Sequence, residues 1–471
     1  MSAREEDIVM DVGSLMPCLP EDSPVKEPVR REKDSSDNTS LMVEIEKMFE
    51  HADASIEMAR WKKHSIYGVP EWVKKMSNRN AYKPRLVSLG PFHNGEPDLL
   101  PMEEHKRRAL LHLLKRSEKN LREFIDAINE VAEILLNAYS GLDEKWRGVK
   151  RGCFVEMMVV DGCFLLESMR TLQRIRDKEV EDNGDYATND PIFSYHGFFF
   201  LWPDIRCDML VLENQLPLLV LQTLEAVQCG KSPSPEHINN LVLRYLDCSV
   251  AESIKDLGLH PLDIYHQNLC APRSDVNDWF EGEKNMSSAV ELNQAGISFK
   301  RSKTRKISDV NFENGVLTVP LIIVDSRREK RFLNLMAFER LHGDAGSDVT
   351  SYIFFMDNLI DSENDVALLR SKGVIKNLMS SDKEVSKLFG NLSKQAVLSR
   401  YSKVNNVHRE VNTYCRKPWN AWRASFIQKY LRNPWVFISL VAAVILLLAT
   451  LLNYFCYLEG YMHGIYLNST C

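Results

Sequence analysis

Five polar side chains stand within otherwise apolar stretches of the sequence: Asp161, Asp208, Glu213, Asn214 and Gln215. A carboxylate in an apolar interior must be hydrogen-bonded or paired with a cation, and burial displaces its pKa. Because a displaced carboxyl pKa is common in catalytic acids, the three carboxylates are candidates for acid–base chemistry. The alternative is a hydrogen-bonded structural network that fixes the chain around Pro217. We favour the network, because no nucleophile or second acid accompanies these residues at a recognisable spacing.

Other common chemistries have no motif in this chain. The glycine-rich phosphate-binding motifs, the G-x-S-x-G esterase motif and the H-E-x-x-H zinc motif are all missing from the sequence. Ten cysteines are dispersed without a C-x-x-C pair, and His and Cys do not occur at zinc-finger spacing. The N-terminus lacks the basic start and apolar core of a signal peptide, so we expect reduced thiols. The sequence therefore predicts no enzyme of a recognisable class, no metal site and no cofactor.

A second group of residues suits contact with a lipid surface. Four aromatic residues recur at spacings of three, four and four after Arg416, which places them on one helix face, and basic residues lie between them. Such a helix lies in the membrane interface, although an aromatic stripe packed on the protein core has the same spacing. The expected membrane-interface residues are Trp419, Trp422, Phe426, Tyr430, Arg423, Lys429, Arg432 and Trp435.

The apolar run that follows is long enough to cross a bilayer. No charged residue occurs from Asn433 to Leu458, and about 20 apolar residues span the hydrocarbon core. Lys and Arg precede the run and none follows it, so the positive-inside rule places the N-terminal body in the cytosol. The short tail then faces the lumen or the cell exterior, where Asn468 begins a glycosylation sequon. We expect post-translational insertion of a tail-anchored, single-pass protein. The sequence does not distinguish the plasma membrane from an endomembrane.

The stretches that position the candidate carboxylates have helical patterns. Cys153–Leu172 and Asp204–Val227 predict central helices, and Pro217 must kink or split the second because it lacks an amide donor. Asn314-Gly315 separates two β-rich runs within Ile307–Val324, which predicts a hairpin. The expected fold class is mainly α: a large helical globular body with one small β-hairpin sheet, plus a single C-terminal transmembrane helix.

Charge divides the chain further. Residues 1–40 hold ten acidic and five basic residues with several prolines, which predicts a disordered acidic tail. The net charge of the whole chain is only −6, so the body is close to neutral and nucleic acid is an unsuitable partner. The predicted parts are the tail at 1–40, a helical body at 41–415, an interfacial aromatic-basic helix at 416–433, a transmembrane helix at 434–455 and a short exoplasmic tail at 456–471.

A series of short motifs between residue 65 and the apolar run resembles the plant family called domain of unknown function 247. They occur in the family's order, and together they are highly specific. The motifs are Ile66–Pro70, Ala81–Pro84, Val87–Gly95, Met102-Glu103 with Lys106, Phe154–Met157, Asp161–Phe164, Asp208–Pro217, Ala289–Gly296, Phe312–Leu317 and Asn334–Glu339.

The resemblance implies a plant protein with a C-terminal membrane anchor and no established enzymatic activity. Some grass members of this family are implicated in self-incompatibility, which suggests recognition between proteins; this step is an analogy, because a fold does not fix a function. Two hypotheses follow. The favoured one is a membrane-anchored interaction or signalling module whose partners are the lipid bilayer and a protein. The other is an enzyme that uses Asp161, Asp208 or Glu213 in a cleft between the central helices.

Overall fold

The computed structural model describes residues 53–177, 186–248, 254–270, 286–394, 403–426 and 434–468, with positions 42, 43, 45 and 396. The chain divides into a short N-terminal unit, Met1–Arg60, and a main unit, Trp61–Cys471. From the sequence we expect a helix over about 41–63. Helix α2 (Ala54–Trp61) matches its second half, begins in the short unit and ends at the first residue of the main unit. The acidic tail predicted at 1–40 lies outside the described residues.

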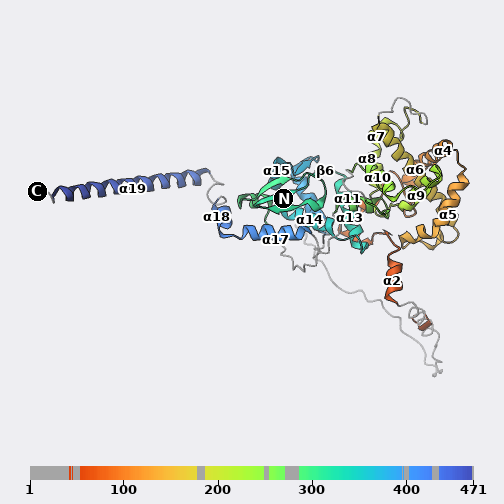
Figure 1. Cartoon of the computed structure of the whole chain (residues 1–471), viewed down its shortest axis with the longest axis horizontal. Coiled ribbons are helices and arrows are strands. Elements are labelled where there is room, and N and C mark those ends of the chain that lie inside the picture. Colours follow the sequence, from red (N-terminus) through yellow and green to blue (C-terminus); the bar gives the residue numbers. More distant parts are fainter. Residues whose placement is uncertain are drawn as a thin grey trace, which may run out of the picture. The chain divides into compact units, whose positions relative to one another are not determined.

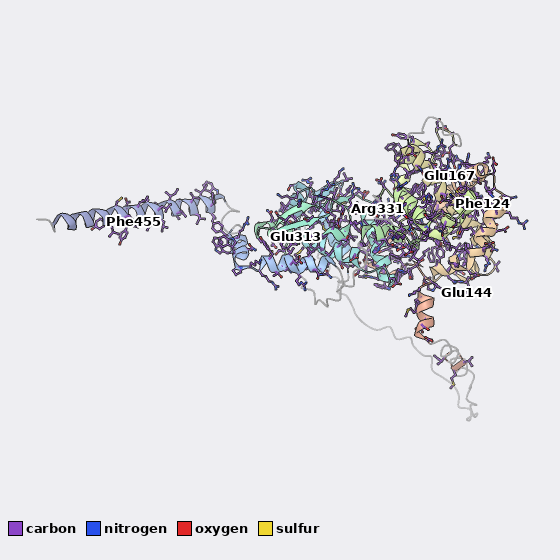
Figure 2. The ribbon with its side chains drawn as sticks, in the orientation of Figure 1. Phe124, Glu144, Glu167, Glu313, Arg331 and Phe455 are labelled. Atoms are coloured by element: carbon purple, nitrogen blue, oxygen red, sulfur yellow. The ribbon has the colours of Figure 1, made fainter. Side chains whose placement is uncertain are left out.

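The first half of the main unit is a group of helices that pack around α6 (Arg151–Arg176), which contacts α4, α5, α9 and α10 (Figure 1). Phe124 of α5 and Glu167 of α6, both labelled in Figure 2, are fully buried. The helices of this group are α3 (Glu71–Met76), α4 (Pro101–Ser117), α5 (Leu121–Ala138), α6, α7 (Tyr195–Phe200), α8 (Trp202–Asp208), α9 (Leu218–Cys229), α10 (Pro235–Tyr245) and α11 (Pro261–Leu269), with short 3₁₀ turns at η1 (Arg79–Tyr82), η2 (Pro97–Leu99) and η3 (Glu144–Trp146).

Local chemistry explains where these helices begin and end. The Asn120 side chain and the Glu123 carboxylate form a capping box at the start of α5, directly after α4 ends in the left-handed residue Glu118. The amphipathic pattern over 103–139, which the sequence leaves as one helix or a pair broken near Ser117, therefore forms two helices. Ser234 caps α10 by accepting from the amide of His237, as the Ser-Pro start predicts.

The second half of the main unit combines helices with short strands. β4 (Asn311–Glu313) and β5 (Val316–Val319) form the predicted antiparallel hairpin. Its turn residues Asn314 and Gly315 have φ values of 51° and 79°, as a two-residue type I′ turn requires. The helices of this half are α12 (Ala289–Gln294), α13 (Arg328–Leu341), α14 (Asp348–Leu359), α15 (Glu363–Ser371), α16 (Asp382–Ser393) and α17 (Lys403–Cys415), with a 3₁₀ turn at η4 (Ile307–Asp309).

The mainly α fold class is confirmed, but parallel strand pairs add to the predicted hairpin. β3 (Ser298–Arg301) pairs with β5, β6 (Ile322–Val324) with β7 (Ile375–Asn377), and β1 (Ile66–Tyr67) with β2 (Tyr139–Ser140). Each parallel pair joins segments separated by intervening chain, so local alternation carries little sign of it.

Two boundaries expected from the sequence, a helix end at Gly390 and the start of a loop at about residue 266, differ from the structure. α16 continues through Gly390 to Ser393, because that glycine keeps helical geometry and ends nothing. The loop expected from 266 begins only after Leu269, since α11 starts from a His260 cap and keeps its pattern to that point. Residues 271–285 of the predicted loop lie outside the described residues.

The C-terminal segment contains two helices, α18 (Pro418–Phe426) and α19 (Pro434–Asn468). Figure 1 draws α19 as one unbroken helix. Within the described residues, α19 is the one helix long and apolar enough to cross a membrane, over Trp435–Leu458. The helix extends past the predicted end of the span at 455 and includes most of the predicted short tail.

Candidate functional site: a buried polar network

The structure buries all five of the polar residues singled out from the sequence, with exposed fractions from 0% for Asn214 to 7% for Glu213. Their local structure differs from the prediction. Asp161 lies in α6 and Asp208 is the last residue of α8, but residues 209–217 between α8 and α9 are not helical. The stretch predicted as one helix that Pro217 kinks or splits is therefore split, with Pro217 at the start of α9 and a non-helical link that is longer than expected. The side chains of Asn214 and Gln215 bond backbone carbonyls of this connection, which replaces helical hydrogen bonds with local ones.

Asp208 binds the backbone of an extended segment, residues 83–90, which lies far from it in the sequence. Its carboxylate accepts the amides of Arg85, Leu86 and Val87 at 2.7–3.2 Å. Lys330 of α13 donates to the same carboxylate at 3.0 Å and to the carbonyl of Lys83 at 2.7 Å. One buried ion pair therefore joins α8, α13 and the extended segment.

Asn214 and Gln215 continue this arrangement with neutral groups. The Asn214 amide oxygen accepts from the Leu89 backbone at 2.7 Å, and its nitrogen donates to the Val87 carbonyl at 3.0 Å. The Gln215 oxygen accepts from the Leu262 amide at the start of α11, at 2.9 Å. Asn214 thus pairs with the extended segment as a neighbouring strand would, while Gln215 connects the α8–α9 link to α11.

Glu213 lies at the edge of the network. It accepts from the Val69 amide at 2.7 Å and forms an ion pair with Lys74 of α3 at 2.8 Å. The Nε2 atom of His93 lies 3.8 Å from the same carboxylate. These contacts hold Val69 and α3, which precede the extended segment in the chain.

Asp161 is paired deep within the body. Its carboxylate lies 2.8 Å from the Nζ atom of Lys106, whose side chain is fully buried, and accepts from the Gly90 amide at 2.8 Å. Burial raises the pKa of Asp161 above its usual value, and the Lys106 ammonium acts against that rise. Lys106 also donates to Ser88 and Glu103, at 3.0 and 2.6 Å. The pair is satisfied on both sides.

Gly90 explains why the chain passes so close to this pair. It has a φ of +74°, and a Cβ there would lie 2.7 Å from the Gln215 carbonyl oxygen and 2.8 Å from the Tyr139 hydroxyl. That hydroxyl donates to the same Gln215 carbonyl at 3.0 Å. A side chain at position 90 therefore has neither the backbone conformation nor the space it needs.

The sequence interpretation missed Asn334 and Lys330. Asn334 accepts from the Leu212 amide at 2.8 Å and donates to the Ala81 carbonyl at 2.8 Å, so α13 belongs to the network. The available signal was Asn334 within the motif Asn334–Glu339. A polar residue in an apolar helical motif indicates a buried partner, but the sequence does not say which one.

Chemically, the network acts as a clamp on the backbone. Both oxygens of each of the three carboxylates face an amide donor or a lysine ammonium in the described residues. Carboxylates held in this way are positioned to order the chain between Ile66 and Gly90, which includes α3, η1 and the extended segment, because each bond is buried and costly to break.

The predicted membrane-interface residues that the structure describes lie on two helices, α18 and α19. On α18 and α19, Trp419, Trp422 and Trp435 are exposed by 71%, 57% and 77%, whereas Phe426 is partly buried. Arg423 lies against Gly296, where a Cβ would be 2.6 Å from its Nη1 atom. Asn468, the predicted glycosylation residue, is the last residue of α19. The interface residues outside the described range are Lys429, Tyr430 and Arg432.

Together these features define a mainly α body whose buried carboxylates and amides clamp an extended segment, followed by an apolar C-terminal helix. The chain belongs to the DUF247 family, described as plant proteins of unknown function, whose family model matches residues 66–449. It is similar to UPF0481 protein At3g47200 of Arabidopsis thaliana, with 31% identity over 434 residues, which cover 84% of this chain and 87% of that protein. A second Arabidopsis thaliana protein with the UPF0481 designation is 21% identical over 494 residues, covering 83% of this chain and 89% of its own length. No solved structure is significantly similar.

Proposed function

We propose that this chain is a membrane-anchored interaction or signalling module, in which α19 crosses a bilayer and the helical body contacts a protein partner in the cytosol. The observation that carries the proposal is α19 itself. None of the apolar stretch Trp435–Leu458 is buried against the rest of the chain. An apolar helix of this length that is left uncovered by its own protein suits hydrocarbon rather than water.

The aromatic face of α18 supports contact with the membrane surface. The rings of Trp419 and Trp422 lie 5.3 Å apart, and those of Trp422 and Phe426 lie 5.4 Å apart. Indole rings favour the headgroup region, where one part of the ring meets water and the other meets hydrocarbon. The other side of the helix is held by the body, because Asn420 is buried and donates to the Tyr414 carbonyl at 2.9 Å. This arrangement favours a helix that holds the body at a set orientation on the bilayer.

The contacts of the buried carboxylates favour an interaction module over an enzyme that uses Asp161, Asp208 or Glu213. A general acid or base must reach the proton that it transfers, within hydrogen-bonding distance or through one water. The oxygens of these carboxylates already accept hydrogen bonds from backbone amides and lysines. A substrate would have to displace those bonds before it could exchange a proton with a carboxylate.

A flotation assay tests the membrane part of the proposal. We expect the full chain to float with vesicles and resist high salt, since apolar insertion does not depend on charge. A chain truncated before Asn433 should bind vesicles rich in anionic lipid only at low salt. Full-length protein that stays in the soluble fraction would contradict the anchor, and a truncated chain whose binding ignores salt would contradict the interfacial role of α18.

The aromatic helix α7 is where we expect a protein partner to bind. Tyr195, Phe199 and Phe200 are exposed by 56%, 52% and 66%, and grouped aromatic side chains are enriched at protein interfaces. Replacing Phe199 and Phe200 with serine should remove specific neighbours from a proximity-labelling profile in plant cells. The matched control is Ile134→Ser on α5, which is 63% exposed and should change nothing. Identical profiles for the two variants would count against α7.

A further inference from the structure

Three side chains of different chemistry meet in the core between α11 and α13. His266 lies in the last turn of α11, Cys270 is the residue that follows the end of this helix, and Glu339 comes from α13. All three are buried, with exposed fractions of 4%, 5% and 9%. The Nε2 atom of His266 lies 2.8 Å from Glu339 Oε1 and 3.6 Å from Cys270 Sγ, and the three atoms lie within 4.8 Å of one another.

A single imidazole nitrogen does not form a strong hydrogen bond to both of its neighbours at once. If Nε2 of His266 carries a proton, it donates to the Glu339 carboxylate and has no lone pair for the Cys270 thiol, whose sulfur is only a weak acceptor for the same proton. If Nε2 accepts from the thiol, its lone pair faces a carboxylate oxygen 2.8 Å away. A cation placed between the three atoms removes this conflict, because every one of them then presents a lone pair to it.

The surroundings of Glu339 match those of a metal-binding carboxylate. Its Oε1 accepts the Val349 amide at 2.8 Å, while Oε2 accepts the amide and the hydroxyl of Thr350 at 2.8 and 2.6 Å. These bonds fix the carboxylate at the start of α14 and leave a lone pair of Oε1 directed to His266. Carboxylate ligands in metal sites are typically oriented by such outer hydrogen bonds.

Charge favours a divalent ion in this place. A thiolate and a carboxylate with a neutral imidazole cancel a charge of +2, so the assembled site is neutral and its burial avoids the cost of an isolated charge.

We propose that His266 Nε2, Cys270 Sγ and Glu339 Oε1 bind a divalent metal ion, with zinc the preferred ion. Nitrogen, thiolate and carboxylate together are the ligand types that zinc accepts in tetrahedral geometry. In an ideal tetrahedral zinc site the ligand nitrogen and sulfur lie about 3.6 Å apart, which is the distance observed between His266 Nε2 and Cys270 Sγ. The ligand nitrogen and oxygen lie about 3.3 Å apart in such a site. Glu339 Oε1, now 2.8 Å from His266 Nε2, must therefore move outward by roughly half an ångström. The described residues supply no fourth such ligand atom, which leaves one coordination position for water or another donor.

Binding releases the thiol proton of Cys270 and moves the imidazole proton of His266 to Nδ1, so one proton leaves for each metal ion bound. The metal ion then ties α11 to α13 and, through Glu339, to the start of α14. This role is independent of membrane anchoring.

The test uses the full, untagged chain, purified in a mild detergent under reducing conditions without chelator. We expect elemental analysis to find about one zinc per chain. Exchange for Co²⁺ should produce the near-ultraviolet charge-transfer band of a thiolate–cobalt bond. Cys270→Ser should abolish that band and weaken zinc binding at least tenfold, whereas Cys207→Ser, another buried cysteine of similar exposure, should retain both.

The wild-type protein alone decides the question, even if a variant fails to fold. Wild-type protein that binds neither zinc nor Co²⁺, or that binds Co²⁺ without a thiolate band, overturns the proposal. Equal metal binding by correctly folded Cys270→Ser and Cys207→Ser variants, as judged by near-ultraviolet circular dichroism, overturns it as well. A weakened metal affinity in His266→Asn supports the imidazole ligand independently of the thiol.

Discussion

Removing the Asp208 carboxylate should be among the most damaging single changes to this protein. Asp208→Ala strands the amides of Arg85, Leu86 and Val87 and leaves the Lys330 ammonium buried beside an empty position. Stranded buried donors cost about 1 kcal/mol or more each, and a buried charge that loses its partner costs several. Allowing for the bond that Lys330 keeps to the Lys83 carbonyl, we expect a loss of about 5 kcal/mol in the free energy of unfolding.

Two variants separate the contributions of shape and charge. Asp208→Asn keeps the shape and one acceptor oxygen but loses the ion pair, so its cost should be about half that of alanine. Combining Asp208→Ala with Lys330→Met removes the uncompensated ammonium, so the double variant should be more stable than the sum of the single losses by about 1–3 kcal/mol. Asp126→Ala on α5, where the side chain is 66% exposed, is the control and should stay within about 0.5 kcal/mol of wild type.

Equilibrium urea unfolding of the full chain in mild detergent, followed by tryptophan fluorescence, measures these differences. Hydrogen exchange adds a local readout, because the three amides bonded to Asp208 should exchange faster in the alanine variant. A loss below about 1 kcal/mol with unchanged exchange at these amides would refute the view that the carboxylate clamps the extended segment.

The remaining predictions concern backbone space, pH and lipid. Gly90→Ala should destabilise the protein by about 3 kcal/mol, as measured by urea unfolding. Gly95 has a similar φ of +83°, but no atom lies within 4 Å of the position of a Cβ there. Gly95→Ala should therefore cost only about 1 kcal/mol. Burial lowers the pKa of His260 to about 4, so its folded form stays neutral while the unfolded chain takes up a proton below pH 6.5. Stability should therefore fall by about 3 kcal/mol from pH 6.5 to 4 in the wild type, relative to His260→Gln. Replacing Trp419 and Trp422 with serine should weaken vesicle binding of the chain truncated before Asn433 in flotation.

Each of these predictions has a clear contrary result. Equal losses for the two glycine variants would show that the space around Gly90 is not limiting. A pH profile in His260→Gln that parallels the wild type would show that this histidine does not carry the acid sensitivity. Unchanged flotation of the tryptophan variant would show that α18 does not meet lipid.

The sequence predicts the helices best where periodicity and end signals agree, as in α5 and α10, and it predicts the β4–β5 hairpin because Asn314-Gly315 is a local signal. It does not predict the three parallel strand pairs, since their partners are far apart in the chain. The polar residues stood out because they interrupt apolar runs, but their partners are mostly backbone amides, which every sequence contains. Lys330 was missed for a related reason. Lysine side chains usually lie on the surface, so the sequence gives no sign that this one forms a buried ion pair.

The sequence allows only part of the proposed metal site to be predicted. His266 and Cys270 are four residues apart at the C-terminal end of α11, a local pair that the sequence shows but that does not have zinc-finger spacing. The third ligand, Glu339, lies 73 positions away on another helix. Only the packing of α11 against α13 brings its carboxylate to the other two.

The most direct test of the proposed function is the topology of the full chain in sealed plant microsomes. A longer tail with a distant glycosylation sequon is appended after Cys471, and the vesicles are treated with protease. The account predicts a tail that is glycosylated and protected, together with a body that the protease digests. A protected body with an accessible, unmodified tail would contradict the cytosolic location of the body, and a chain recovered outside the membrane fraction would contradict the anchor itself.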